Sequence, residues 1–179
     1  RIFYPDKFKF SILIGLPIGL DDSKDILNMF LKISNKFNLN KENYFIKPHP
    51  TWSEFKIKSM FDKGKLNDFK FVQGDFHDHV EKVNLVVSNA SSISLESLTK
   101  HVPVIIVAPS TGIIQNPIPR KVSSKIWRLV KNSKELKETI FYFKNNSNNK
   151  FYKEYESVKK NYFEPVTRNG VLKFLNIKN

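Results

Sequence analysis

The sequence predicts an α/β fold, namely a Rossmann-like parallel sheet of five or six strands with helices on both faces, closed by C-terminal helices. Short apolar, β-branched runs alternate about five times with stretches of helical spacing, a pattern typical of parallel βαβ units. The 179 residues are enough for one domain with a sizeable core. A hydrophobic content of 40% indicates a folded rather than a disordered protein.

Each expected strand is a short apolar run bounded by glycine, proline or polar residues. The first run, 8–15, ends at Gly15, and the second, 43–50, stops at a proline. The later runs are rich in β-branched or aromatic residues and cover 69–74, 84–89, 102–108 and, as a short sixth strand, 125–132.

The expected helices lie between these runs and start near residues that favour helix N-termini. The first, 24–37, follows Asp21, Asp22 and Ser23. The others are 53–64, a short helix or turn at 75–83, 91–100 opened by serines, 133–145 capped by Ser133, and then 151–163 and 167–177. This places the sheet core at 8–145 and the C-terminal helices at 148–176.

Composition limits the partners and the compartment. A net charge of +13, from 30 basic and 17 acidic residues, favours an anionic partner such as a nucleotide, a nucleic acid or an acidic membrane surface. There is no cysteine, which excludes disulfides and cysteine zinc sites. The apolar runs are shorter than the roughly 18 residues of a spanning helix, and no signal peptide is visible. We therefore expect a cytoplasmic protein.

Polar segments follow four of the expected strands, at the edge where open parallel sheets bind ligands. They are "GLPIGL", "KPHP", "SNASS" and "APSTG". We expect a ligand pocket there. Its further candidate residues are Gly15, Pro17, Asn89, Ser110 and Thr111, and Trp52, Gln115, Asn116 and Trp127 are candidates to frame the ligand.

Two of these segments suit a phosphate group. Pro48 and Pro50 restrict the backbone around His49, so that its imidazole is held at the strand end with Lys47 beside it. Ser91 and Ser92 follow the fourth strand, where a helix N-terminus favours anions. The alternatives are a turn with an incidental histidine and simple helix capping.

Glu96 stands one helical turn after the serine pair. Its carboxylate can accept hydrogen bonds from both hydroxyls of a ribose, as an acidic residue does in dinucleotide folds, or it can be an ordinary helix glutamate. The spacing of His77, Asp78 and His79 matches no zinc pattern, and Asp75 and Asp78 favour capping of the following turn. No Walker loop, Rossmann glycine triplet, Gly-x-Ser-x-Gly elbow or RNA-recognition signature occurs, so we expect neither a metal nor a cofactor.

"IKPHP", followed about 40 residues later by "LVVSNASSISLESLTKHVPVIIV", resembles the C-terminal, donor-binding half of GT-B glycosyltransferases. The most similar groups are bacterial surface-polysaccharide enzymes: the sialyl-, polysialyl- and Kdo-type capsule transferases and the teichoic-acid glycerophosphotransferases. The resemblance covers about 8–176. It implies that His49, Ser91 and Ser92 contact the phosphate of a CMP- or CDP-linked donor and that Glu96 faces the ribose. His101 stands where many relatives have glycine, and Asn89 lies where an aspartate often precedes the serine pair.

The same resemblance implies an enzyme of cell-envelope biosynthesis. It would transfer a sugar of the sialic acid or Kdo type, or glycerol phosphate, to a surface polysaccharide or a lipid-linked acceptor, with His49 as the catalytic residue. A complete GT-B enzyme has a second domain for the acceptor. We therefore expect residues 1–179 to be a single donor-binding domain from a longer two-domain chain, inactive in transfer by itself.

Two other functions stay open. A UDP-sugar 2-epimerase shares the arrangement of strand, serines and glutamate. A non-catalytic basic module for nucleic acid or an anionic surface would explain the charge but not the two motifs, so no nucleic acid is expected. The aromatic and lysine positions of 151–163 fit either a peripheral contact with an anionic membrane or an ordinary docked helix.

Overall fold

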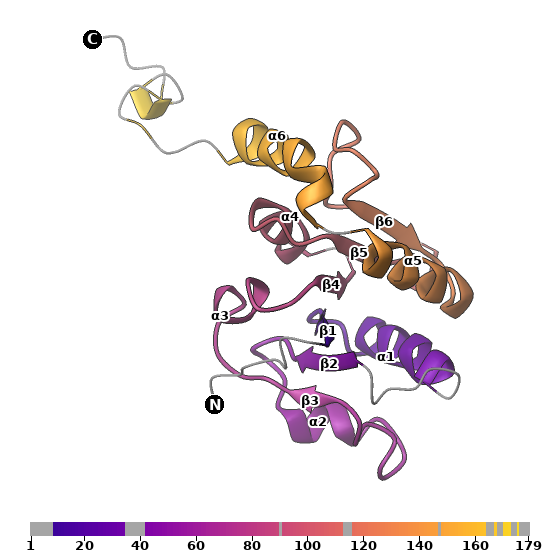
Figure 1. The fold of residues 1–179 in the computed structure, drawn as a ribbon. Helices are drawn as coiled ribbons and strands as arrows, with labels where there is room; N and C mark the ends of the chain where they lie inside the picture. The colour runs from indigo at the N-terminus through magenta and orange to yellow at the C-terminus, as the bar shows by residue number, and fades with distance from the viewer. Residues whose placement is uncertain are drawn as a thin grey trace.

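The computed structural model describes residues 9–34, 42–89, 91–112, 116–146 and 148–163, together with 167, 170–172 and 175. Six strands form one parallel sheet in the order β3-β2-β1-β4-β5-β6 (Figure 1). This is the doubly wound order, which reverses between β1 and β4. The strands are β1 (Phe10–Gly15), β2 (Glu42–Lys47), β3 (Lys70–Phe71), β4 (Leu85–Ser88), β5 (Val104–Val107) and β6 (Trp127–Val130).

Helices cover both faces of the sheet, which confirms the predicted fold class (Figure 1). Successive strand residues point to opposite faces, so Ile12 and Ile14 enter one core and Leu13 enters the other. The first core lies under α1 (Leu20–Ser34), α2 (Glu54–Lys58) and α5 (Ser133–Asn145). The second lies under α3 (His77–Val80), α4 (Ile93–Thr99) and α6 (Tyr152–Tyr162), which follows the 3₁₀ helix η2 (Asn148–Phe151).

Several predicted helix boundaries were wrong. Helix α1 begins at Leu20, so Asp21 and Asp22 lie inside its first turn, where carboxylates favour the positive end of the helix. Helix α5 is capped by Asn132, whose side chain accepts from the N–H of Glu135, and not by Ser133.

Helix α2 is much shorter than the predicted 53–64. It has five residues, of which Ile57 alone is buried, and Phe55 is 82% exposed. A longer helix at this place would gain little burial, and the chain turns instead, with Gly64 at a φ of 92°.

His101 has a φ of 58°, the one positive value among the described non-glycine residues. It follows Lys100, the C-cap of α4. The N–H of His101 donates to Leu98 and the N–H of Val102 donates to Ser97, a Schellman ending that usually uses glycine. The turn therefore forms with histidine at the position where glycine is usual.

The His101 side chain compensates for this backbone conformation. Its Nε2 lies 2.8 Å from Glu156 and its ring stacks on Tyr155, both on α6. None of the described helices combines the length and apolar character needed to cross a membrane. The predicted helix 167–177 lies largely outside the described residues.

Candidate functional site

A cavity of about 350 Å³ opens at the carboxyl edge of the sheet, beside the point where the strand order reverses. Five of the predicted site residues line it together: Gly15, Lys47, His49, Ser91 and Ser92. They come from the ends of β1, β2 and β4, which the parallel register brings to one edge. The other lining residues are Leu16, Pro48, Pro50, Asp75, Phe76, His77 and Ile93.

The turn after β2 fixes the tautomer of His49. The N–H of Trp52 donates to the His49 carbonyl over 2.8 Å, and the N–H of Thr51 donates to the imidazole Nδ1 over 3.3 Å. The Thr51 hydroxyl lies 2.9 Å from the same nitrogen. Because an N–H can only donate, Nδ1 accepts, and the proton of the neutral ring is on Nε2, which can donate to a ligand.

Trp52 connects this turn to the loop after β1. Its indole N–H donates to the carbonyl of Ile18 over 2.7 Å. The N–H of Leu16 donates to the carbonyl of Lys47 over 2.9 Å, which joins the same two segments closer to the sheet. The two walls of the cavity are therefore hydrogen-bonded to each other.

Lys47 supplies positive charge at the end of β2. Burial lowers the pKa of its ammonium below the usual 10.5, while the carboxylates of Asp75 and Asp78 act in the opposite direction. A partly desolvated ammonium gains from an added negative charge, since the anion replaces lost hydration. Lys47 therefore favours an anionic ligand, while the Asp75 carboxylate in the same wall acts against one.

The serines after β4 divide into two groups. Ser94 is buried, and its hydroxyl lies 3.1 Å from that of Ser88, which fixes the start of α4 against the strand. Ser92 occupies the N-cap position of α4, but its side chain makes no capping hydrogen bond. The hydroxyl of Ser92, which lines the cavity, is therefore not used as a helix cap.

Asn89 and Glu96 do not line this cavity. Asn89 is 6% exposed and its amide donates to Asp22 over 3.1 Å, which connects the loop after β4 to α1. The carboxylate oxygen Oε2 of Glu96 lies 3.4 Å from Nε2 of His77, which lines the cavity. Glu96 is thus one side chain away from the cavity, and its ribose role stays a prediction.

Three further candidates lie outside the cavity wall. The carbonyl of Pro17 accepts from the Ser23 hydroxyl, and the N–H of Ser110 donates to Asp25 over 3.0 Å. Thr111 is exposed beside Ser110. Trp127 lies on β6, where its indole N–H donates to Val122, and Gln115 is outside the described residues.

Asp75, Phe76 and His77, which follow β3, also line the cavity, a contribution not predicted from the sequence. Their position after an expected strand was the available signal. A second hollow of about 430 Å³ lies against the same turn and shares with the first Lys47, Pro48, His49, Pro50 and Asp75. Together the hollows are within the size range of small-molecule sites.

No family model matches the chain, and no curated protein matches its sequence. Solved structures do match its fold. The wall teichoic acid polymerase TagF, soaked with CDPG, has a TM-score of 0.62 at 11% identity. The match covers 97% of this chain and 42% of the TagF chain. S. aureus MnaA with UDP has a TM-score of 0.61 at 12% identity, and the match covers 96% of this chain and 47% of the MnaA chain. TarM has a TM-score of 0.61 at 18% identity, and the match covers 98% of this chain and 37% of the TarM chain.

At these identities the TM-scores show the fold alone, the parallel α/β sheet with helices on both faces. The chain spans less than half the length of each of the three matched structures.

Proposed function

We propose that this chain is the donor-binding half of a GT-B enzyme that acts on a nucleotide-linked sugar or a related unit. The observation that carries the proposal is the meeting of Lys47, His49, Ser91 and Ser92 in one cavity. The cavity lies at the switch point of a doubly wound sheet, the place where such folds bind nucleotides.

The proposed role of these residues in the reaction is electrostatic. Nε2–H of His49 and the two serine hydroxyls donate to phosphate oxygens, and Lys47 adds positive charge. As the bond between the donor unit and the nucleotide breaks, negative charge grows on the leaving phosphate, and these groups stabilise it. The acceptor and its general base come from a separate domain, so the isolated chain binds nucleotide without efficient transfer.

The finer assignment is a cytidine-linked donor and a surface polysaccharide or lipid-linked acceptor. The resemblance of "IKPHP" and "SNASSISLESL" to sialyl-, Kdo-type and teichoic-acid enzymes supports it, with His49 and the serine pair at the phosphate. The likeness to TagF with CDPG agrees with a cytidine diphosphate donor. Glu96 would reach the ribose after His77 moves from its carboxylate.

A second candidate is a sugar-nucleotide 2-epimerase. The fold likeness to the UDP-GlcNAc 2-epimerases of Neisseria meningitidis, with a TM-score of 0.56 at 17% identity, and of Methanocaldococcus jannaschii, with 0.60 at 14% identity, favours it. Both candidates use the same cavity and differ in the base that it accepts.

Calorimetric titration with CMP, CDP and UDP tests the proposal. We expect the wild type to bind CMP or CDP at millimolar concentration or below, and His49→Ala to weaken binding by about tenfold or more. Lys134→Ala, which removes an exposed charge on α5, is the matched control. A preference for UDP would support the epimerase. Absence of binding to all three nucleotides by folded protein would refute both, and DNA retention with a steep salt dependence would then favour a basic module.

A further inference from the structure

Helix α1 forms hydrogen bonds to three of the loops at the carboxyl edge of the sheet. The buried Ser23 hydroxyl donates to the loop after β1, and the N–H of Ser110, in the loop after β5, donates to Asp25 over 3.0 Å. Asp22 accepts from the amide of Asn89, in the loop after β4, over 3.1 Å. The apolar face of α1 packs into the first core, so this helix gives the three loops a fixed support.

Asn89 connects α1 to the loop that carries the serine pair. Its side chain is 6% exposed, and its Oδ1 has no hydrogen-bond partner within the described part of the chain. The amide Nδ2 donates to Oδ2 of Asp22. A buried amide has lost its hydrogen bonds to water, and a bond to a charged acceptor is stronger than one to a neutral oxygen. The carboxylate of Asp22 therefore fixes where the Asn89 side chain lies.

The main chain of Asn89 connects this side chain to the cavity wall. Its carbonyl accepts from the Ser88 hydroxyl over 3.0 Å and from the N–H of Ser91 over 2.8 Å. Ser91 and Ser92 line the cavity together with His49, which follows β2. A shift of Asn89 therefore moves the serine hydroxyls relative to His49.

We propose that Asp22 is a positioning residue of the phosphate site: it holds Ser91 and Ser92 in place through Asn89 and makes no contact with the nucleotide. Asp22 lines neither of the two hollows around His49. From behind the wall, its negative charge repels a bound phosphate less than a carboxylate in the wall would. The inference rests on the proposed function, because the group that the serines contact is the phosphate of the nucleotide.

A purely local role is the alternative for Asp22. Carboxylates in the first turn of a helix are stabilised by the partial positive charge there. Asp21 shares this turn and this charge, but its side chain is exposed. Asp21→Ala is therefore a matched control. A role limited to the helix end predicts similar effects of Asp21→Ala and Asp22→Ala on stability and none of either on CDP affinity.

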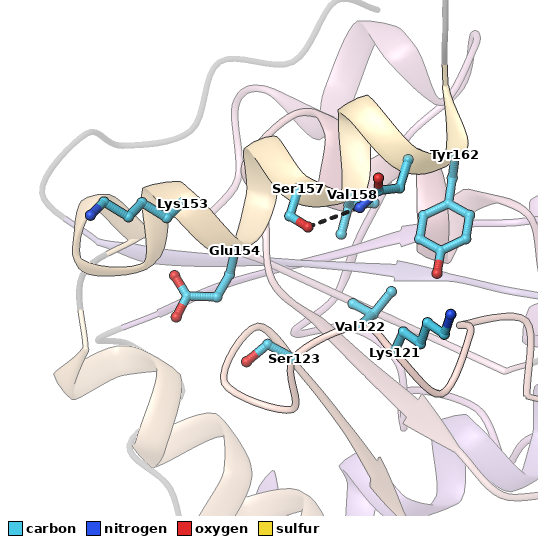
Figure 2. Close-up of a pocket in the computed structure, with 9 residues that line it drawn as sticks. Lys121, Val122, Ser123, Lys153, Glu154, Ser157, Val158 and Tyr162 are labelled. Carbon is cyan, nitrogen blue, oxygen red and sulfur yellow. Dashed lines mark hydrogen bonds between the residues drawn. The ribbon is translucent and has the colours of Figure 1, made fainter.

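A second control lies in a separate cavity of about 580 Å³, between α6 and the loop before β6 (Figure 2). Glu154 is in its wall and accepts a hydrogen bond from Lys125 over 3.0 Å, a carboxylate contact similar in length to that between Asp22 and Asn89. This cavity shares no lining residue with the two hollows around His49. Glu154→Ala therefore removes a comparable contact that has no connection to the serine pair.

Calorimetric titration with CDP tests the inference. Asp22→Ala removes the acceptor, and we expect it to weaken binding about three- to tenfold. Asn89→Asp places a second carboxylate at the contact, and repulsion weakens binding by about tenfold or more. Asp22→Asn/Asn89→Asp restores one amide and one carboxylate in exchanged positions and recovers part of the affinity lost in Asn89→Asp. Asp21→Ala and Glu154→Ala stay at the wild-type value.

A double-mutant cycle shows whether Asp22 acts through the serines. In the Ser91→Ala/Ser92→Ala background no hydroxyls are left to position, so Asp22→Ala changes the remaining CDP affinity by less than about twofold. A role in overall stability would leave its effect as large as in the wild type. Urea denaturation of each variant ensures that affinities are compared between folded proteins.

Four results would overturn the inference: wild-type affinity in Asp22→Ala, an undiminished effect of Asp22→Ala in the background without the serines, equal weakening in either control, or no recovery in the folded exchange variant. Should Asn89→Asp fail to fold, the double-mutant cycle decides between the same two roles. Absence of CDP binding by the wild type would refute the proposed function and this inference together, whereas the four results above leave the proposed function standing.

Discussion

The N–H of Thr51 donates a hydrogen bond to Nδ1 of His49. This contact favours Nε2 as the ring nitrogen that carries the proton, and the Thr51 hydroxyl lies 2.9 Å from the same Nδ1. The two prolines place the imidazole, whereas Thr51 leaves Nε2–H as the donor for a phosphate oxygen.

Thr51→Val keeps the backbone N–H and removes the hydroxyl contact at Nδ1. The imidazole is then held less firmly, so we expect CDP binding to weaken by about two- to tenfold, the effect of one hydrogen bond, while Thr51→Ser stays near the wild-type value. Calorimetry measures both affinities. The ¹⁵N shifts of the His49 ring report the tautomer and stay unchanged in the valine variant, because the backbone N–H of residue 51 remains. Equal affinities in all three proteins would show that the Thr51 hydroxyl has no role in binding.

The lowered pKa of Lys47 predicts that CDP affinity depends on pH. Burial lowers its pKa below 10.5, so the ammonium loses its proton at a lower pH than an exposed lysine. A bound anion raises the pKa again, and CDP affinity therefore falls as pH rises through the lowered value. In Lys47→Arg the guanidinium stays charged, and the alkaline loss disappears even if the absolute affinity differs. Calorimetry from neutral to alkaline pH compares the two profiles; identical slopes would exclude Lys47 as a phosphate contact.

The lowered pKa of Lys47 also makes the stability of the ligand-free protein depend on pH. Between the folded and the unfolded pKa of Lys47, the unfolded chain binds more protons than the folded one. The free energy of unfolding therefore gains a contribution as pH rises through this interval. Denaturant titration of the wild type and Lys47→Arg isolates that contribution.

Gly15 forms part of the cavity wall opposite Ile93. A Cβ at Gly15 would overlap with Cδ1 of Ile93, and its next neighbours lie at 3.8 Å. Gly15→Ala thus forces Ile93 to move, and because both residues line the cavity, CDP binding weakens. Gly15→Ala/Ile93→Ala removes the overlap and recovers part of the affinity. If the double variant binds as weakly as the single one, crowding is not the cause.

The positive φ of His101 and its side-chain contacts predict the order of stability among variants at this position. A non-glycine residue at positive φ costs about 1–2 kcal/mol, which the contacts to Glu156 and Tyr155 offset. His101→Ala keeps the backbone cost and loses the contacts, so its free energy of unfolding falls by about 1–2 kcal/mol. His101→Gly loses both and stays within about 1 kcal/mol of the wild type. Urea denaturation gives the order, and an alanine variant as stable as the glycine variant would contradict it.

The centre of the sheet could be predicted because β1, β4 and β5 are buried on both faces. β1 and β4 appear as continuous apolar runs, and their exposed fractions are close to zero. Helix α2 was overestimated, because whether 59–64 continues a helix depends on burial against the rest of the protein, and local spacing contains no information on this.

The same distinction applies to the site. His49, Ser91 and Ser92 follow strand ends in the sequence, so the rule for parallel sheets was enough to bring them together. Asp75, Phe76 and His77 were missed because their place depends on β3 lying beside β2, a pairing of two residues that the sequence pattern does not specify. The bond between Asn89 and Asp22 likewise joins positions 67 residues apart.

A crystal structure of this chain with CDP tests the central claim most directly. The account predicts phosphate oxygens within hydrogen-bond distance of Nε2 of His49 and of at least one hydroxyl of Ser91 and Ser92, with Lys47 beside them. A nucleotide bound elsewhere, with His49 and the serine pair making no contact to its phosphates, would contradict it.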